Sequence, residues 1–190
     1  LNHIINNLKI YKMQEFDVTI IGSGPGGYTA AIRAAQLGFK TAIVERDKLG
    51  GVCLNWGCIP TKALLKSAEM MNKVKHLGDY GLKIEGAGYD FPKIIQRSRK
   101  VAEASEKGVA FLMKKNKITI INGTGSFNAD KTISVKDKDG REVEIIKSKH
   151  TIVATGARAK SIPGIKFDEK KILSSTGAML AHEVPAKLTI

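Results

Sequence analysis

The chain has 190 residues, of which 43% are hydrophobic and 26% are charged, a balance typical of a folded globular protein rather than a disordered one. No uninterrupted apolar run approaches the roughly 20 residues of a membrane-spanning helix, and two cysteines are too few for a disulfide-rich secreted scaffold. The chain contains 31 Lys and Arg residues and 18 Asp and Glu residues, so its net charge is +13. This surplus suggests an anionic partner such as nucleic acid, a membrane surface or a phosphorylated ligand.

Residues 1–12 are expected to be an extension that precedes the first domain. The stretch carries lysines but no acidic residue, and it has no continuous apolar centre of the kind that a secretory signal needs. A mitochondrial-type presequence is a poor alternative, because the stretch contains no Arg and no Ser. Met13 is therefore the expected natural start, and the cytoplasm is the expected compartment.

A strand–helix–strand unit is expected over residues 16–45. Phe16–Ile21 is a short apolar run rich in β-forming residues, which predicts a strand. From about residue 25 to 37, small alanines at helical spacing predict a helix that lies close to a sheet and ends at Gly38. Thr41–Glu45 is a second apolar strand, so the two strands should be parallel and adjacent.

Two long helices are expected next, from about 57 to 76 and from Asp90, as N-cap, to about 116. Short strands should follow at Ile118–Ile121, Thr132–Val135, Glu142–Ile146 and Thr151–Val153. An Asp139-Gly140 pair predicts positive-φ positions in a hairpin between the middle two, so a β-meander is expected over about 117–149. Lys187–Ile190 is typical of the opening of a buried strand, which indicates a truncated chain. The predicted fold class is α/β.

A glycine-rich turn joins the first strand to the first helix. Gly22–Gly27 fits the pattern G-x-G-x-x-G: Gly22 permits the tight turn, Gly24 lets a pyrophosphate approach the backbone, and Gly27 lets the helix pack on the sheet. The helix N-terminus then offers unpaired N–H groups to phosphates. Glu45 ends the next strand 18 residues after Gly27, and its carboxylate can accept hydrogen bonds from both hydroxyls of a ribose. An acidic residue at this position disfavours a dinucleotide that carries a 2′-phosphate on that ribose. The pattern predicts a dinucleotide site; the alternative is a structural turn.

Cys53 and Cys58 form the second candidate site. In a straight helix, residues five apart rise about 7.5 Å, more than the roughly 7 Å that a disulfide spans between Cα atoms. The sulfurs can meet only if the backbone bends, which Gly57 allows, and Pro60 places Cys58 near the start of the next helix, where a thiolate is stabilised. These residues alone leave open a redox-active pair, two free core cysteines or an inert disulfide.

No metal site is expected, because the histidines are not spaced as metal ligands are. They are His3, His76, His150 and His182.

The segment Gly50–Lys62 resembles the flavin-dependent pyridine nucleotide–disulfide oxidoreductases. That family's signature, GG-x-C-x-N-x-G-C-x-P-x-K, is matched at every fixed position: Gly50, Gly51, Cys53, Asn55, Gly57, Cys58, Pro60 and Lys62. Leu54, Ile59 and Ala63–Leu65 are similar to the lipoamide branch of the family. Gly123–Gly125 before Phe127, and Ala154–Gly156 after an apolar strand, match two weaker features. The resemblance covers residues 16–190.

The resemblance implies a role for each matched residue. Gly22, Gly24 and Gly27 would hold the FAD pyrophosphate, and Glu45 its adenosine ribose. Cys58 would be the charge-transfer thiolate against the isoalloxazine ring, Cys53 the interchange thiol and Lys62 a positive charge near flavin N5. The catalytic residues implied are therefore Cys53, Cys58 and Lys62. The cofactor-binding residues implied are Gly22, Gly24, Pro25, Gly26, Gly27, Glu45, Arg46, Gly50, Gly51, Val52, Cys53, Cys58, Lys62, Gly125, Ala154, Thr155 and Gly156.

The implied activity is the oxidation of dihydrolipoyl groups by FAD, with NAD as the final acceptor, through a Cys53–Cys58 disulfide. A Rossmann-like FAD-binding domain with a parallel sheet, long helices and an inserted β-meander would span 13–183, and 184–190 would begin a truncated NAD-binding domain. Full-length members add that domain and a dimerisation domain, which supplies a His–Glu pair from the partner subunit. The chain alone should therefore hold some flavin without turnover. A homodimer is expected for the full-length protein, serving the lipoyl domain of a 2-oxoacid dehydrogenase or glycine cleavage complex.

Two alternatives stay open at this point. One is a sister enzyme of the mercuric or glutathione reductase type. The other, of a different class, is a basic nucleic-acid-binding module. It is disfavoured because only 6% of residues are aromatic, and because the densest basic stretch lies on one predicted helix, interrupted by Glu103 and Glu106. A solvated helix face explains that stretch, so neither a nucleic acid nor a membrane is expected as partner.

Overall fold

The computed structural model describes residues 13–190, so the expected N-terminal extension lies outside the described residues. The chain forms two compact units. The first, called the sheet unit, contains the described residues up to 49 and residues 109–155; the second, called the helical unit, contains 50–108 and 156–190. Among residues 13–190, no helix combines the length and the apolar character needed to cross a bilayer.

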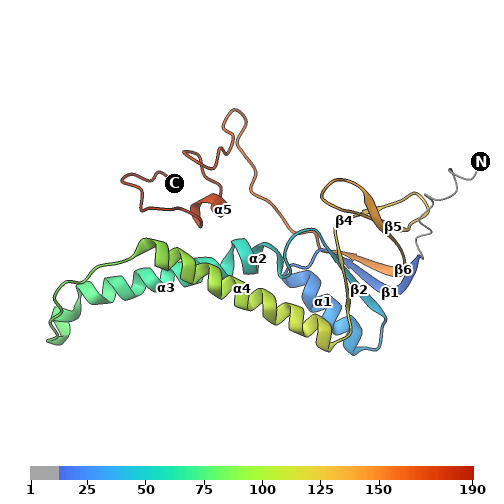
Figure 1. The fold of residues 1–190 in the computed structure, drawn as a ribbon, viewed down its shortest axis with the longest axis horizontal. Coiled ribbons are helices and arrows are strands. Elements are labelled where there is room, and N and C mark those ends of the chain that lie inside the picture. The colour runs from blue at the N-terminus through green and yellow to red at the C-terminus, as the bar shows by residue number, and fades with distance from the viewer. Residues whose placement is uncertain (1–12) are drawn as a thin grey trace, which may run out of the picture. The chain divides into compact units, whose positions relative to one another are not determined.

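The described residues contain one mixed β-sheet with the strand order β3-β2-β1-β6-β5-β4 (Figure 1). Its strands are β1 (Gln14–Ile21), β2 (Thr41–Glu45), β3 (Thr119–Asn122), β4 (Thr124–Phe127), β5 (Ile133–Lys136) and β6 (Glu142–Val153). Strand β1 pairs in parallel with β2 and β6, and β2 pairs in parallel with β3. Strands β4, β5 and β6 form an antiparallel meander. The expected α/β class with a mainly parallel sheet and a meander is confirmed.

Helix α1 (Pro25–Gln36) connects β1 to β2 and packs on both strands. Its buried residues are Gly27, Ala31 and Ala34, which are small enough to let the helix axis approach the sheet. The helix is followed by Gly38 with φ +88°, a left-handed conformation that glycine adopts without strain. The predicted strand–helix–strand unit is therefore confirmed.

The long strand β6 replaces two strands that the sequence predicts separately. Its first residues pair antiparallel with β5, and Ile146–Val153 pair in parallel with β1. The polar residues in between do not interrupt the strand, because they form ion pairs with β1. The Nζ of Lys147 lies 3.1 Å from Oε1 of Glu15, and the Nζ of Lys149 lies 2.8 Å from Oδ1 of Asp17. The hydrogen bond from Lys149, with that from the Lys40 backbone, lowers the pKa of Asp17. Cross-strand ion pairs of this kind stabilise a ladder modestly.

Two further differences concern the meander. The predicted strand near 118–121 forms as β3, but it pairs with β2 at the other edge of the sheet rather than opening the meander. The first strand of the meander is instead β4, a four-residue strand that contains Gly125 and that no apolar alternation predicts. The hairpin between β5 and β6 has the expected Gly140 with φ +79°. Its loop is closed by Asp137, whose Oδ1 accepts hydrogen bonds from the backbone N–H groups of Asp139 and Arg141, both at 2.9 Å.

The helical unit contains the elements α2 (Gly51–Trp56), α3 (Cys58–Lys75), a 3-10 turn (Leu77–Tyr80), α4 (Phe91–Lys115), whose last residues belong to the sheet unit, and α5 (Ser175–Ala178). Asp90 caps α4 as predicted, because its Oδ1 accepts from the Lys93 N–H at 3.0 Å. Helices α3 and α4 lie side by side (Figure 1), and Arg97 of α4 donates 2.8 Å to the Ala63 carbonyl of α3.

Several exposed ion pairs lie on the basic surfaces of α3 and α4. On α3, Lys73 at 2.6 Å and Lys66 at 2.9 Å flank Glu69, and they lower the pKa of this carboxyl to about 2. On α4, Lys107 lies 2.6 Å from Glu103. Exposed pairs of this kind contribute little stability, and they support the interpretation of these basic stretches as solvated helix faces.

The residues near the C-terminus correct one expectation. Lys187–Ile190 form no strand, and Leu188 and Ile190 are exposed. A strand needs a hydrogen-bonding neighbour, and none of the described residues supplies one to this segment. The domain boundaries expected at 183 and 184 stay a prediction.

Candidate functional site

Close backbone packing explains two of the three pattern glycines in the turn after β1. Gly22 has φ +99°, and a Cβ placed on it would lie 2.3 Å from the Ala154 carbonyl oxygen. A Cβ on Gly27 would lie 1.9 Å from the Gly22 carbonyl oxygen and 3.4 Å from a methyl group of Ile20. Atoms cannot approach this closely, so both positions require glycine if the turn, α1 and the end of β6 are to pack as they do.

The remaining glycines of the turn lie in open space. A Cβ on Gly24 or Gly26 would meet no atom within 4 Å, so packing does not explain why these residues are glycines. The N-cap of α1 is Gly24, no side chain caps this end, and Pro25 occupies the first turn. The backbone N–H groups of an uncapped helix N-terminus, with the positive end of the helix dipole, form an anion site. Bare backbone beside such an N-terminus fits the diphosphate of a dinucleotide.

Glu45 anchors the turn at the carboxyl end of β2. Its side chain is only 9% exposed, and its Oε2 accepts from the backbone N–H of Ser23 at 2.8 Å and from the Ser23 hydroxyl at 2.6 Å. Its Oε1 accepts from the Asp47 N–H at 2.9 Å. A carboxylate offers about four acceptor positions, and three are occupied here, so one position remains for a ribose hydroxyl, whereas the sequence predicts positions for both hydroxyls. The sequence reasoning missed Ser23, a buried hydroxyl inside the glycine pattern.

Replacing Glu45 tests this anchor. We expect Glu45→Ala to lower the free energy of unfolding by about 3 kcal/mol, because the buried N–H and hydroxyl of Ser23 lose a charged acceptor. Glu45→Gln keeps the shape and one acceptor oxygen, so about 1–2 kcal/mol is expected. Urea denaturation of both variants measures the difference. Equal losses in the two variants would mean that the volume of the side chain, and not its charge, holds the turn.

The other expected cofactor-binding residues of the sheet unit surround the carboxyl ends of the parallel strands. Gly125 of β4 would place a Cβ 3.3 Å from Ile21 and 3.4 Å from Val44, the residues near the ends of β1 and β2. Ala154 continues the ladder by donating its N–H to the Ile21 carbonyl at 2.8 Å, and Arg46 and Thr155 are exposed beside these ends. Strands β2 and β6 flank β1 on opposite sides, so this edge is a topological switch point, where open α/β sheets bind ligands.

The cysteine segment of the helical unit bends at Gly57, the residue that allows the bend required for the two sulfurs to meet. Helix α2 carries Cys53 and ends at Trp56, and α3 begins at Cys58. Between them Gly57 has φ −149° and ψ −115°, and a Cβ there would lie 3.0 Å from the Val52 carbonyl oxygen. The break places Cys53 on α2 and Cys58 at the start of α3, so the two cysteines do not lie on one straight helix, in which their sulfurs could not meet.

Both cysteines are free thiols in this structure; Cys53 is half-buried and Cys58 is exposed. A hydrogen bond to Cys58, together with burial and the negative charge of a Cys58 thiolate, raises the pKa of Cys53. The Cys58 backbone N–H and the positive charge of Lys62 act in the opposite direction. Lys62 is exposed one turn after Cys58 on α3, on the same side of the helix. The Cys53 thiol, held in its protonated form by these influences, therefore lies beside an exposed second thiol and a positive charge.

The sequence pattern of the family described as Pyridine nucleotide-disulphide oxidoreductase matches residues 16–190. The chain belongs to this family. The resemblance inferred from Gly50–Lys62 is therefore confirmed.

Dihydrolipoyl dehydrogenases are among the relatives of this oxidoreductase chain. Dihydrolipoyl dehydrogenase 1, mitochondrial, of Arabidopsis thaliana is 49% identical over 178 residues, which make up 93% of this chain and 35% of that protein. The dihydrolipoyl dehydrogenase of Chlorobaculum parvum is 44% identical over 176 residues, or 93% of this chain and 37% of that protein. The chain thus spans about a third of the length of the curated relatives it matches.

A solved structure supports the fold. The crystal structure of LpdA from Mycobacterium tuberculosis superimposes with a TM-score of 0.81 at 22% sequence identity, and the match covers 91% of this chain and 38% of that one. At this identity the likeness shows the fold alone, and it includes the parallel sheet and the meander.

The structure places the expected site residues of this oxidoreductase chain in two groups, each within one unit. The sheet unit holds Gly22, Gly24, Pro25, Gly26, Gly27, Glu45, Arg46, Gly125, Ala154 and Thr155. The helical unit holds Gly50, Gly51, Val52, Cys53, Cys58, Lys62 and Gly156. Gly50, with φ +89°, is the N-cap of α2, and a Cβ there would lie 2.4 Å from Leu54. In residues 13–190, no three His, Cys, Asp or Glu side chains gather as metal ligands.

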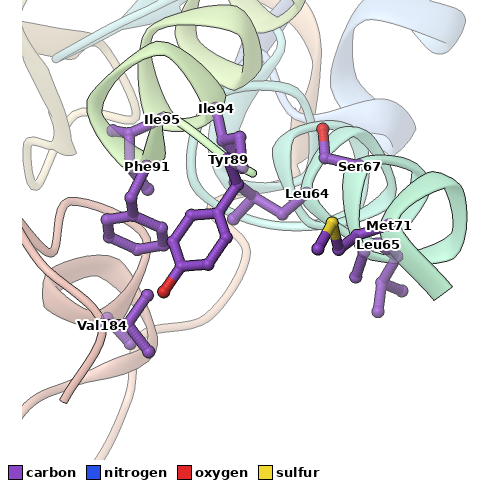
Figure 2. Close-up of a pocket in the computed structure, with 11 residues that line it drawn as sticks. Leu64, Leu65, Ser67, Met71, Tyr89, Phe91, Ile94, Ile95 and Val184 are labelled. Carbon is purple, nitrogen blue, oxygen red and sulfur yellow. The ribbon is translucent and has the colours of Figure 1, made fainter. Parts of the chain in front are cut away.

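The helical unit also contains an apolar pocket of about 350 Å³. Figure 2 shows Leu64 and Met71 of α3 on one side, and Tyr89 and Phe91 near the start of α4 with Val184 on the other. No charged side chain lines the pocket, and none of the expected site residues does. The groups that can perform chemistry therefore lie at the cysteine segment rather than in this pocket.

Proposed function

We propose that this chain is the FAD-binding portion of a dihydrolipoyl dehydrogenase, with Cys53 and Cys58 as the redox-active pair. One observation carries the proposal: the chain breaks at Gly57, so that Cys53 lies in α2, Cys58 is the first residue of α3, and the neighbouring Cys58 raises the pKa of Cys53. If the two cysteines were inert core residues, Cys58 would not need its exposed position beside Lys62. Identities of 44–49% to dihydrolipoyl dehydrogenases support the choice of branch.

The glycine turn is proposed to hold the FAD diphosphate on the N-terminus of α1, at Gly24 and Gly26, where backbone is accessible. Glu45 would orient the adenosine ribose through its remaining acceptor position. Arg46, Gly125 and Thr155 would complete the adenine and ribose side of the site. Gly50, Gly51, Val52, Lys62, Ala154 and Gly156 stay predictions as cofactor-binding residues.

The cysteine pair is proposed to exchange with a dihydrolipoyl group. A substrate thiolate attacks the Cys53 sulfur of the Cys53–Cys58 disulfide, so the S–S bond breaks, a mixed disulfide forms and Cys58 leaves as the thiolate. The second substrate thiol then attacks the substrate sulfur of the mixed disulfide, so the bond from that sulfur to Cys53 breaks and the lipoyl disulfide is released. The proton lost by the second substrate thiol is taken up by the departing Cys53 sulfur, which becomes the thiol. Two electrons thus pass from the substrate to the cysteine pair. When bound, FAD supplies the acceptor that takes these electrons onward to NAD.

The remaining expectations concern the whole protein. NAD binding, a homodimer and a lipoyl-domain partner from a 2-oxoacid dehydrogenase or glycine cleavage complex are proposed from the resemblance. Cytoplasmic localisation stays a prediction; proteins named as mitochondrial and proteins from bacteria are both among the relatives. An FAD-binding domain over 13–183 followed by the start of an NAD-binding domain at 184–190 also stays a proposal.

The substrate class is tested with the complete protein, reconstituted with FAD. We expect dihydrolipoamide to reduce NAD at least about a hundredfold faster than any other dithiol does. Contacts between an enzyme's pocket and its correct substrate discriminate against other substrates by about this factor. Stopped-flow absorbance of NADH measures it. Activity with glutathione disulfide or mercuric ion, in the absence of activity with dihydrolipoamide, would replace this proposal with the sister-enzyme alternative.

A further inference from the structure

Arg99 of α4 reaches across to the end of α2, the helix that carries Cys53. Its Nη1 donates a hydrogen bond of 2.7 Å to the backbone carbonyl of Asn55. Its guanidinium also lies 5.0 Å from the centre of the Trp56 ring, within the range of a cation–π interaction. Asn55 and Trp56 are the last two residues before Gly57, so one side chain contacts the helix end from which the redox segment bends.

The cost of placing Arg99 here indicates that the contact is specific. Its Nε and Nη2 are buried without a hydrogen-bond partner, and burial lowers the pKa of Arg99. Burying donors of a charged group without partners is unfavourable. The favourable contacts described for the guanidinium are the Asn55 carbonyl and the Trp56 ring, so these contacts direct its position.

A guanidinium is well suited to this position. The last carbonyl groups of a helix lack partners inside the helix and carry the negative end of its dipole, and a positively charged donor stabilises them. Asn55 is itself 3% exposed, and its Nδ2 donates 3.0 Å to the Gly51 carbonyl at the other end of α2. This six-residue helix is therefore stabilised by two hydrogen bonds, one from the Asn55 side chain within the helix and one from Arg99 of α4.

We propose that Arg99 is a positioning residue for the Cys53–Cys58 pair: by capping the end of α2 it holds the break at Gly57 in the geometry that brings the two sulfurs together. This inference rests on the proposed redox role of the two cysteines. The equilibrium between dithiol and disulfide depends on how closely the folded chain holds the two sulfurs in the reduced state. Loss of Arg99 therefore weakens disulfide formation, and the reduction potential of the pair becomes less negative.

The test equilibrates the 190-residue chain with mixtures of reduced and oxidised dithiothreitol and counts free thiols by alkylation and mass spectrometry. In this exchange the two protein thiols give two electrons and two protons to the oxidised reagent, which becomes the dithiol. We expect Arg99→Met to reduce the equilibrium constant for the Cys53–Cys58 disulfide about tenfold, which corresponds to about 30 mV. Arg99→Lys keeps a charged donor for the Asn55 carbonyl, and it should recover part of that loss.

Arg97→Met is the matched control. Arg97 lies on the same helix and also donates to a backbone carbonyl, but that carbonyl is Ala63 within α3, away from the break. Both variants should lower the thermal midpoint of unfolding, while only Arg99→Met should change the disulfide equilibrium. If Arg99→Met does not fold, Arg99→Lys and Trp56→Leu provide the comparison, and each should show a smaller loss.

The outcomes separate this inference from the proposed function. A wild-type chain in which no Cys53–Cys58 disulfide forms at any ratio of the reagent contradicts both. A disulfide that forms in the wild type, with the same equilibrium constant in the Arg99 variants as in Arg97→Met, contradicts the positioning role alone. A change confined to the Arg99 and Trp56 variants supports it.

Discussion

Cys53→Ser in the complete, FAD-loaded protein should lose turnover of dihydrolipoamide by about three orders of magnitude or more, the scale on which removal of an essential nucleophile acts. The proposed exchange forms a mixed disulfide at Cys53, and a serine oxygen cannot take the place of that sulfur. FAD content should stay unchanged, because the glycine turn and Glu45 belong to the other unit of the chain. NADH formation measures the first expectation, and the flavin absorbance of the purified protein measures the second.

Cys58→Ser is the matched variant and tests the order of the two thiols. It should lose turnover to the same extent, because the disulfide can no longer form. The two variants should differ in long-wavelength flavin absorbance: Cys53→Ser keeps the charge-transfer band of a Cys58 thiolate, and Cys58→Ser lacks it. The opposite pattern would reverse the assignment, an outcome of interest because Cys58 is the more exposed thiol in the chain described here. Full turnover in both variants would exclude a redox role for the pair.

Gly27→Ala should destabilise the chain by about 3 kcal/mol or more, at the upper end of the usual cost of overpacking. The added methyl carbon would lie 1.9 Å from the Gly22 carbonyl oxygen. Because that atom is backbone and not the end of a flexible side chain, α1 or the end of β1 must move to relieve the overlap. FAD affinity should fall as well, since the same movement displaces the helix N-terminus. Urea denaturation gives the free energy of unfolding, and flavin fluorescence gives the affinity.

Gly26→Ala is the control one residue earlier. A Cβ at this position meets nothing within 4 Å, and alanine is the better helix former, so stability should stay the same or rise by up to about 1 kcal/mol. FAD affinity should nevertheless fall, because the methyl group would occupy space proposed for the diphosphate. Equal destabilisation of the two variants would contradict the packing explanation for Gly27. Unchanged FAD affinity in Gly26→Ala would contradict the proposed position of the diphosphate.

Most individual elements could be predicted because their signals are local. Phe16–Ile21 and Thr41–Glu45 are apolar runs and form β1 and β2. Asp90 is a capping residue placed before a periodic stretch, and it caps α4 in the structure. The break at Gly57 could be stated from the sequence only as a condition: two cysteines five residues apart on a straight helix cannot meet, so a redox-active pair requires the chain to bend between them.

The errors in the sheet have non-local causes. The polar residues of β6 suggest a gap between two strands, but Glu15 and Asp17 of the neighbouring strand pair with Lys147 and Lys149 and keep the ladder continuous. Strand β4 has no apolar alternation, and it forms because β5 offers it an antiparallel edge. The position of β3 beside β2 likewise depends on which edge of the sheet is available.

The residues of the candidate site also fall into those with a local sequence signal and those that depend on non-local contacts. The glycine pattern and the cysteine signature are short motifs, so Gly22, Gly27, Cys53 and Cys58 could be chosen from the sequence. No motif indicates that Ser23 binds Glu45, 22 residues away, or that Arg99 binds the Asn55 carbonyl, 44 residues away. These partners are brought together by the packing of whole elements.

The sequence by itself determined the family and the strand–helix–strand unit with its glycine turn, and it singled out Cys53 and Cys58 as candidates, because each of these depends on residues close together in the chain. It also placed the densest basic stretch on one helix interrupted by Glu103 and Glu106, which favours a solvated helix face over a nucleic-acid site for that stretch. Only the tertiary structure decided which strands are neighbours, which glycines are required by packing and which leave room for a ligand, and what holds Glu45 and the end of α2. Those features depend on contacts between distant residues, whose energies exist only once the elements have packed.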